Sequence, residues 1–174
     1  KHVWCEKPMS TSLADSQTMT DAAATSSGQT IIGYNYTKNP AVTHARRLIE
    51  SGVIGRVAAI FCRYDVDNEA DGDRPWSWRM SRDQSGTGAN GDVLSHVISV
   101  AHYLTGSTIK RVVGDIAIVH GEREDPQNKG SRKSVDNDDM VAALVQFENG
   151  VHGHIGASRV TWGYKCGLRW EVHG

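Results

Sequence analysis

The sequence predicts the end of an α/β domain followed by an α+β domain with a mostly antiparallel, open sheet. Residues 2–34 show a strand, a helix and a strand joined by short loops, the pattern of a parallel βαβ unit. After residue 106 the helical patterns give way to apolar strand-like runs. Two of these runs flank Glu148-Asn149-Gly150, and Asn-Gly between apolar runs is a strong hairpin signal. We place the domain boundary near Asn35, which gives segments 1–35 and 36–174.

Composition and charge narrow the classes of protein. A chain of 174 residues with a net charge of -1 offers no basic surface for nucleic acid. No apolar run approaches the ~20 residues that span a bilayer, and no signal peptide is present, so we expect no membrane partner. Cys5, Cys62 and Cys166 are too widely spaced for a disulfide framework or a zinc site, which fits a cytoplasmic setting. The chain begins at Lys1, directly before an apolar run, and ends at Gly174, directly after a strand-like run. We therefore expect a partial sequence.

Strands and helices are expected to alternate before residue 106. In chain order they are a buried strand at 2–5, a helix at 13–24, a strand at 30–34, a helix at 41–51 and a strand at 56–66. Ser10 or Ser12 is suited to cap the first helix, with Leu13 and Met19 facing inward. Pro40 lies in the first turn of the second helix, where no backbone N–H is needed.

Strands dominate the remaining chain. They are expected at 109–120, 140–147, 151–160 and 166–172. The segment 122–139 is charged and has Val135 as its one apolar residue, which predicts a long, solvated loop. Within it, Asp136–Asp139 lacks the glycine and the distal glutamate of a calcium loop, so we expect a solvated acidic turn.

The helix expected over Gly91–Leu104 carries two different stripes. Apolar residues that face the core recur at helical spacing, namely Val93, Val97, Val100, Ala101 and Leu104. Asp92, His96, Ser99 and Tyr103 form a polar stripe instead of the charged face of a simple surface helix. A carboxylate one turn from a histidine can orient the ring and raise its basicity. A structural histidine in a capped helix is the equally good alternative.

Two further motifs favour structural interpretations. Gly86–Gly91 matches G-x-G-x-x-G, but the preceding segment is polar where a nucleotide-binding loop requires an apolar strand. We interpret it as a close backbone approach at a helix N-terminus, which remains open to a polar ligand. His152 and His154 lie on one face of a strand and are too few for zinc, so we expect solvent-facing residues and no metal site.

Three side chains have both a structural and a ligand-binding interpretation. Trp78 and its neighbour Trp76 are by default core or interface residues, whereas Arg79 beside them is suited to clamp a polar ligand. Lys7 follows a strand, and ligands bind beyond the carboxyl ends of strands in parallel α/β sheets. An exposed loop lysine explains Lys7 equally well.

Three separated motifs resemble those of the Gfo/Idh/MocA family of NAD(P)-dependent oxidoreductases. They are Trp4-Cys5-Glu6-Lys7-Pro8, Gly33-Tyr34-Asn35-Tyr36 followed by Asn39-Pro40, and Gly91-Asp92-Val93-Leu94-Ser95-His96 followed by Tyr103-Leu104-Thr105-Gly106. Their order and spacing make the resemblance specific, and it covers essentially the whole chain. It implies that 1–35 ends a Rossmann domain whose nucleotide loop lies upstream, and that the α+β domain is also cut short.

The resemblance also assigns roles. It implies that Lys7, Asp92 and His96 are the catalytic residues. It also implies that these three residues and Ser99 contact the substrate. It places Glu6, Lys7 and Asn35 near the nicotinamide ribose of NAD or NADP, and Trp78 and Arg79 against the cofactor. The implied substrate is a sugar or cyclic polyol, and the implied assembly is a homo-oligomer formed through the open sheet face. Many members have an aspartate at the position of Ser99, so this departure bears on substrate identity.

The residue types fit hydride transfer from a secondary alcohol. A histidine with an ordinary pKa of about 6.5 is suited to remove the hydroxyl proton. Lys7 is suited to stabilise the developing alkoxide, while Asp92 orients His96 or holds a second hydroxyl. The alternatives are a non-catalytic sugar-binding or regulatory protein on the same fold and a metal-dependent enzyme with Asp92 and His96 as ligands. Without the nucleotide loop, we expect the chain alone to be inactive.

Overall fold

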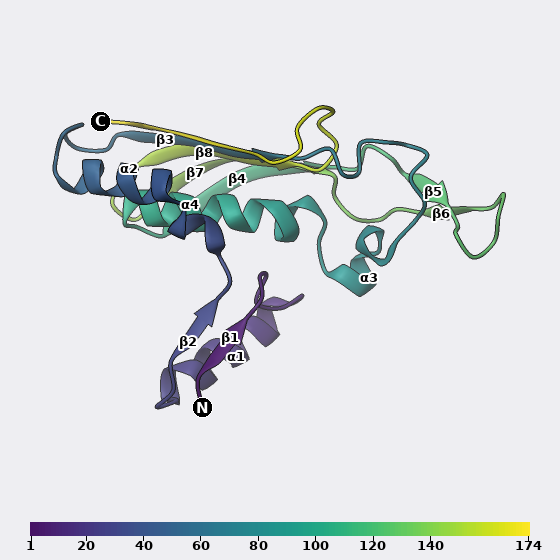
Figure 1. The fold of residues 1–174 in the computed structure, drawn as a ribbon, viewed down its shortest axis with the longest axis horizontal. Coiled ribbons are helices and arrows are strands. Elements are labelled where there is room, and N and C mark those ends of the chain that lie inside the picture. The colour runs from purple at the N-terminus through teal and green to yellow at the C-terminus, as the bar shows by residue number, and fades with distance from the viewer.

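Two groups of elements make up the computed structural model, which describes residues 1–174 (Figure 1). The first contains β1 (Val3–Cys5), α1 (Leu13–Thr25) and β2 (Thr30–Ile32). A 3₁₀ turn at Asn35–Lys38 leads from it into the second group, a five-stranded sheet with helices on one face. No helix is both long enough and apolar enough to cross a membrane.

The N-terminal group is a parallel βαβ unit, as its pattern predicts. β1 and β2 pair in parallel, and Ser12 caps α1 by accepting a hydrogen bond from the backbone N–H of Asp15 at 3.1 Å. The expectations of a buried first strand and an inward Leu13 are wrong, because Trp4 is 71% exposed and Leu13 is 86% exposed. Two short strands and one helix form a single interface, and there is no second layer to cover their other faces.

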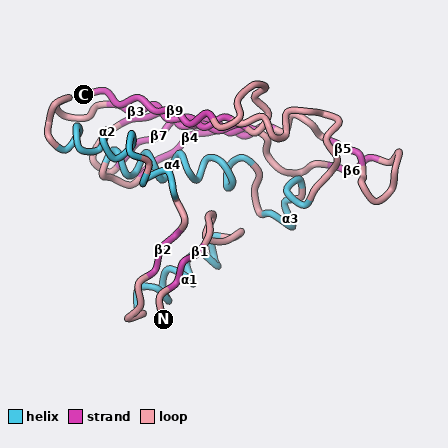
Figure 2. Tube along the Cα trace, viewed as in Figure 1, coloured by secondary structure: helices cyan, strands magenta, loops and turns pink.

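The second group contains both helices and strands (Figure 2), and it is an α+β domain whose sheet is mostly antiparallel, as expected. Its strand order is β4 (Ile109–Ala117), β7 (Met140–Phe147), β8 (His152–Ser158), β3 (Ala59–Asp65) and β9 (Gly167–His173). All neighbours pair antiparallel except β3 and β8, which pair in parallel. The hairpin between β7 and β8 turns at Gly150, which has a φ of 86°. Glycine adopts this left-handed conformation without steric cost.

Two helices, α2 (Pro40–Glu50) and α4 (Ser95–Thr105), cover one face of the sheet (Figure 1). α2 begins as expected: the side chain of Asn39 accepts from the N–H of Ala41, and Pro40 follows in the first turn. The core between these helices and the sheet is made of aliphatic side chains from both, including Val42, Ile60, Val97, Val100, Leu104, Val145 and Ile155. The opposite face of the sheet has no helix over it (Figure 1).

The segment 122–139 differs from the solvated loop that its charge predicts. It contains a short hairpin of β5 (Glu122–Glu124) and β6 (Arg132–Ser134), and Arg123 within it is buried. The expected solvated turn at its end is also wrong, because Asn137, Asp138 and Asp139 are all buried. These side chains accept or donate hydrogen bonds within the fold, so their burial is compensated. Asp139, for example, accepts from the backbone N–H groups of Val119 and His120 and pairs with Arg159.

Candidate active site

Lys7 and Asp92 meet although 85 residues separate them in the chain. Lys7 follows β1, and its Nζ extends to the helix that begins at Asn90, where a π-helical turn at Asn90–Leu94 runs into α4. Lys7 Nζ donates to Asp92 Oδ1 at 2.6 Å and to the backbone oxygen of Asp92 at 2.8 Å. The contact joins the two groups of elements and places a cation beside the polar stripe of the helix.

His96 lies one turn after Asp92 and is 8% exposed. Three tyrosine rings approach its imidazole edge-on, Tyr36 at 4.9 Å, Tyr34 at 5.9 Å and Tyr64 at 6.0 Å between ring centroids. Its Nδ1 is fully buried and has no hydrogen-bond partner. No hydrogen bond joins Asp92 to the imidazole: the carboxylate of Asp92 binds Lys7, and the three tyrosine rings surround the ring of His96.

The environment of His96 favours the neutral ring. The pKa of His96 is lowered from its ordinary value of 6.5 to about 4, chiefly by burial; the nearby ammonium of Lys7 also lowers it, whereas the carboxylates of Asp92 and Glu6 raise it. This differs from the expected value near 6.5 because the helix packs the ring into the aromatic pocket. A neutral imidazole at pH 7 has a free lone pair, which a proton acceptor requires.

A hydrogen-bonded cluster of Tyr36, Tyr64 and Cys166 stands beside His96. The two hydroxyls are 2.8 Å apart, and Cys166 Sγ lies 3.3 Å from the first and 3.2 Å from the second. These contacts lower the pKa of the Cys166 thiol, whereas burial raises the pKa of both tyrosines. The sequence analysis gave this cluster no role, although Tyr64 shares the inward face of β3 with Ile60 and Cys62.

The residues implied to contact a cofactor occupy two places. Glu6 is exposed at the end of β1 and lies over Gly33, where a Cβ atom would stand 3.2 Å from Glu6 Oε2. Asn35 is exposed at the start of the 3₁₀ turn after β2. Both therefore follow the carboxyl ends of parallel strands, where such sheets bind ligands.

Trp78 and Arg79 lie apart from these residues in sequence and start a short 3₁₀ turn, Trp78–Met80. The guanidinium of Arg79 stacks over the ring of Trp78 at 4.5 Å, and both side chains are exposed. Trp76 is half-buried and donates from its indole to the backbone oxygen of Ser134 at 3.0 Å. A core role is therefore wrong for Trp78, and an exposed cation on an aromatic plane is suited to a polar ligand.

Ser99 follows His96 on the polar stripe and is half-buried. Its hydroxyl has no hydrogen-bond partner within the chain, in contrast to Thr105 on the same helix, which donates to the backbone oxygen of Ala101 at 2.8 Å. Its place three residues after His96 puts it on the same side of the helix.

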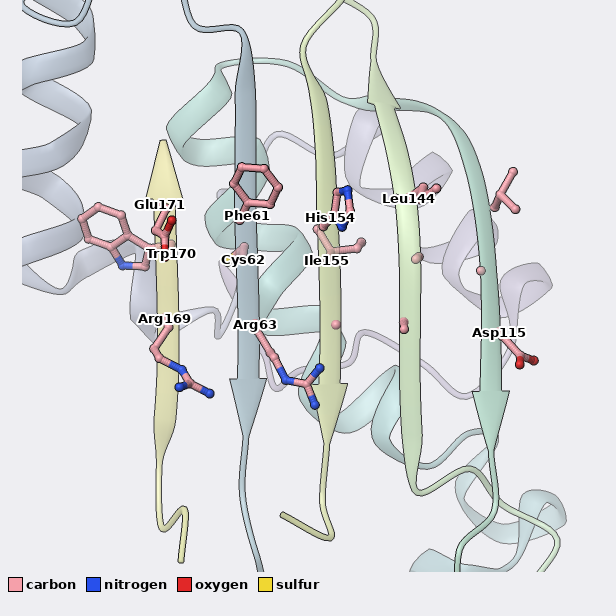
Figure 3. A pocket seen from close by; sticks show the side chains of 15 residues that line it. Phe61, Cys62, Arg63, Asp115, Leu144, His154, Ile155, Arg169, Trp170 and Glu171 are labelled. Atoms are coloured by element: carbon pink, nitrogen blue, oxygen red, sulfur yellow. The ribbon is translucent and has the colours of Figure 1, made fainter. Parts of the chain in front are cut away.

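The remaining motifs fall outside this site. Gly86–Gly91 follows a short helix, α3 (Arg82–Ser85), and no strand precedes it, so the loop lacks the context of a dinucleotide fingerprint. His152 and His154 are exposed, as expected. A pocket with a volume of ≈ 750 Å³ lies on the uncovered face of the sheet between Phe61, Arg63 and His154 (Figure 3). His96 belongs to the helix on the opposite face.

Comparison with known proteins decides the family. The model of the Gfo/Idh/MocA C-terminal domain matches residues 42–174, which is most of the chain. The chain belongs to the Gfo/Idh/MocA family. The match begins after the 3₁₀ turn and contains Asp92, His96 and the whole five-stranded sheet.

Individual members of the Gfo/Idh/MocA family align over the entire chain. Levoglucosan dehydrogenase of Pseudarthrobacter phenanthrenivorans is 33% identical over 190 residues, which cover 100% of this chain and 47% of that protein. The crystal structure of an NAD binding oxidoreductase from Klebsiella pneumoniae is 37% identical with a TM-score of 0.96, covering 100% of this chain and 46% of its own. Levoglucosan dehydrogenase in complex with NADH and levoglucosan is 34% identical with a TM-score of 0.92, covering 100% and 46%. The chain thus spans about half the length of these relatives.

Proposed function

We propose that the protein carrying this chain is an NAD(P)-dependent dehydrogenase that oxidises a secondary alcohol of a sugar or cyclic polyol. The observation that carries this proposal is the contact of Lys7 with Asp92 beside a buried, neutral His96. A purely sugar-binding protein needs hydrogen-bond donors and acceptors, but it has no need for a proton acceptor held neutral next to an ammonium group. The named dehydrogenases among the relatives support the same conclusion.

The mechanism assigns one task to each side chain. His96 accepts the proton of the reacting hydroxyl, and Nε2 is the nitrogen for this role because Nδ1 is enclosed. With a pKa of about 4, the ring is a weak base, so the hydroxyl must be acidified by a neighbouring cation. Lys7 supplies that cation and stabilises the developing alkoxide. Asp92 holds the ammonium of Lys7 in place, and Ser99 contacts another hydroxyl of the substrate.

The residues present fit a nicotinamide cofactor. Glu6, Lys7 and Asn35 follow the carboxyl ends of β1 and β2 and would face the nicotinamide ribose, and Gly33 leaves room there that a Cβ atom would fill. Arg79, stacked on Trp78, would face the charged part of the cofactor. Bound NAD(P)+ would supply the acceptor for the hydride that leaves the carbinol carbon. On this proposal, residues 1–35 are the last part of a Rossmann domain, and residues 36–174 bind substrate.

A dehydrogenase assay tests the proposal. The protein that carries this chain, at the length of its relatives, is incubated with NAD+ or NADP+ and with levoglucosan, L-sorbose, glucose 6-phosphate or inositol, and NAD(P)H absorbance is followed. We expect cofactor reduction with at least one of these compounds and resistance to a metal chelator. Binding of a sugar by calorimetry without any reduction of either cofactor would favour the non-catalytic alternative. Activity abolished by the chelator would favour the metal-dependent one.

We further propose that the uncovered face of the sheet binds a second copy of the same chain. Large apolar side chains on this face are exposed, among them Phe61, Val113 and Leu144. Arg63 and Arg169 stand on the same face as Asp115 and Glu171, so the surface carries both charges and is suited to self-association (Figure 3). Sedimentation of the wild type and of Leu144→Asp tests this: we expect an oligomer that dissociates on substitution. A monomeric wild type would contradict it.

A further inference from the structure

The glycine-rich loop before the catalytic helix surrounds a carboxylate of the protein itself. The N–H of Gly88 donates to Asp138 Oδ1 at 2.8 Å, and the N–H of Asn90 donates to Oδ2 at 2.6 Å. Between them, the N–H of Ala89 donates to the backbone oxygen of Asp138 at 2.8 Å. Three consecutive N–H groups at the start of the helix, which have no partner within a helix, thus all bind one residue.

The fit between the loop and Asp138 is close. Asp138 is 3% exposed, and a Cβ atom on Gly88 would lie 1.9 Å from its backbone oxygen. Because the obstacle is backbone, it cannot swing aside as a side chain would. Glycine is therefore required at position 88 for contact with Asp138. The carboxylate of Asp138 therefore occupies the anion-binding position at the N-terminus of the helix, where a polar ligand was expected as one possibility.

The same turn of backbone carries Asp92. The N–H of Asp92 donates to the backbone oxygen of Gly88 at 3.0 Å, so the residue that binds Asp138 also begins the turn. Lys7 contacts the backbone oxygen of Asp92 as well as its carboxylate. The contact therefore depends on the path of the main chain through the π-helical turn Asn90–Leu94, and not only on the rotamer of Asp92.

We propose that Asp138 is a positioning residue for the dehydrogenase reaction, which fixes the turn that presents Asp92 to Lys7 and leads into His96. The inference rests on the proposed function. Asp138 touches neither Lys7 nor His96 in the structure, and it acts through the N–H groups of Gly88, Ala89 and Asn90. A displacement of about 1 Å at a reacting group lowers turnover by up to about 10²-fold, so holding this turn has a measurable consequence.

The chain offers a matched control in the next residue. Asp139 is 1% exposed and also accepts from two backbone N–H groups, those of Val119 and His120. These lie beyond the end of β4 and not in the helix that carries Asp92. Asp138→Asn and Asp139→Asn therefore each remove a buried carboxylate that accepts from two backbone N–H groups. Asp139→Asn also breaks the ion pair with Arg159, but only Asp138→Asn changes the start of the catalytic helix.

The test measures kcat, KM and the thermal midpoint of the protein at the length of its relatives. We expect Asp138→Asn to lower kcat about tenfold and Asp138→Ala about 10²-fold, with KM for NAD(P)+ within about threefold of wild type. The asparagine retains one acceptor oxygen, so it rescues part of the activity. We expect Asp139→Asn to lower the thermal midpoint at least as much, with kcat within about twofold. In the Asp138→Ala protein, Asp92→Asn should reduce kcat less than it does in wild type, because the contact with Lys7 is already disturbed.

The outcomes separate this inference from the proposed function. An active wild type in which Asp138→Asn retains full kcat, or in which the effects of Asp138→Ala and Asp92→Asn multiply, would overturn the positioning role alone. A wild type without dehydrogenase activity would overturn the proposed function and this role with it. If Asp138→Ala does not fold, the kcat of Asp138→Asn compared with that of Asp139→Asn still tests the positioning role.

Discussion

Helix α1 of the N-terminal unit and helix α4 of the second domain differ sharply in how many of their side chains are buried. α1 has no buried residue, although its sequence contains Leu13, Met19 and three consecutive alanines. α4 is shorter than α1 and buries six residues, including His96 and Leu104. Both helices are well formed, so the difference lies in the partner. α4 packs on a five-stranded sheet, whereas α1 has two strands of three residues each.

An apolar stripe therefore predicts which face of a helix can be buried, but that face is buried only where a sheet or another helix packs against it. The candidate site is divided between the same two regions. Lys7 comes from the sparsely packed N-terminal unit, and Asp92 and His96 come from the packed domain. The contact of Lys7 with the carboxylate and the backbone oxygen of Asp92 links the two regions.

Truncating one leucine in each region gives the largest expected difference. Leu104→Ala removes a fully buried side chain from α4 and should lower the free energy of unfolding by about 2–5 kcal/mol. Leu13→Ala changes a side chain that is 86% exposed and should alter it by less than about 0.5 kcal/mol. Urea unfolding of the 174-residue chain measures both. Equal losses would show that α1 is packed as well as α4.

Replacing a histidine on each side of α4 sharpens the contrast within the packed domain. His96→Ala should lower kcat by at least ~10²-fold, since general base catalysis is worth about that much. His102→Ala is the control: His102 is also partly buried, but its Nε2 accepts from the N–H of Ile109 and it lies away from Lys7. We expect kcat within about threefold for this variant. Retention of full activity by His96→Ala would refute the assignment of the base.

The same histidine predicts a pH dependence of stability for the packed domain. The pKa of His96 is about 4 in the folded state, below its ordinary value of 6.5, so the unfolded chain binds more protons between these values. The stabilising contribution is present above pH 6.5 and is lost as the pH falls toward 4. Between pH 7 and pH 4, wild type should lose about 1–2 kcal/mol more than His96→Gln, as measured by urea unfolding. Parallel pH profiles would contradict a buried, neutral ring.

The smallest effect concerns the thiol beside the aromatic pocket. Contacts with Tyr36 and Tyr64 lower the pKa of Cys166, whereas burial raises the pKa of Cys62 to about 12. Iodoacetamide should therefore alkylate Cys166 at least about tenfold faster than Cys62 at pH 7, because the thiolate is the nucleophile. Tyr64→Phe should slow the reaction of Cys166 by a few-fold. Mass spectrometry of the labelled peptides measures both rates, and an unreactive Cys166 would contradict the exposed cluster.

Sequence reasoning predicted the secondary structure and the mostly antiparallel sheet well, because periodicity and turn residues are local signals. Gly150 in the hairpin and Asn39-Pro40 at the start of α2 are examples. It singled out Asp92 and His96 from the polar stripe of the helix, and Lys7 from its place after a strand, but only the family resemblance joined the three into one site. Nothing in the spacing of 85 residues between Lys7 and Asp92 indicates that they touch.

The errors about polar residues share one physical cause, since burial of a polar residue depends on distant partners. Asp138 and Asp139 lie in an acidic run that is typical of a solvated turn, yet they satisfy backbone N–H groups from elsewhere in the chain. The pKa of His96 followed the same rule, because the rings of Tyr36 and Tyr64 come from other elements. The glycine-rich run Gly86–Gly91, which contains Gly88, was the local sign of a close approach.

A double-mutant cycle on Lys7 and Asp92 tests most directly whether the two regions form one active site. Lys7→Met, Asp92→Asn and the double variant are compared with wild type by kcat/KM for the best sugar substrate. We predict that each single variant loses about 10–10²-fold and that the double variant loses little more than either, because both substitutions break the same contact. Losses that multiply in the double variant would contradict the account and would place the two residues in separate roles.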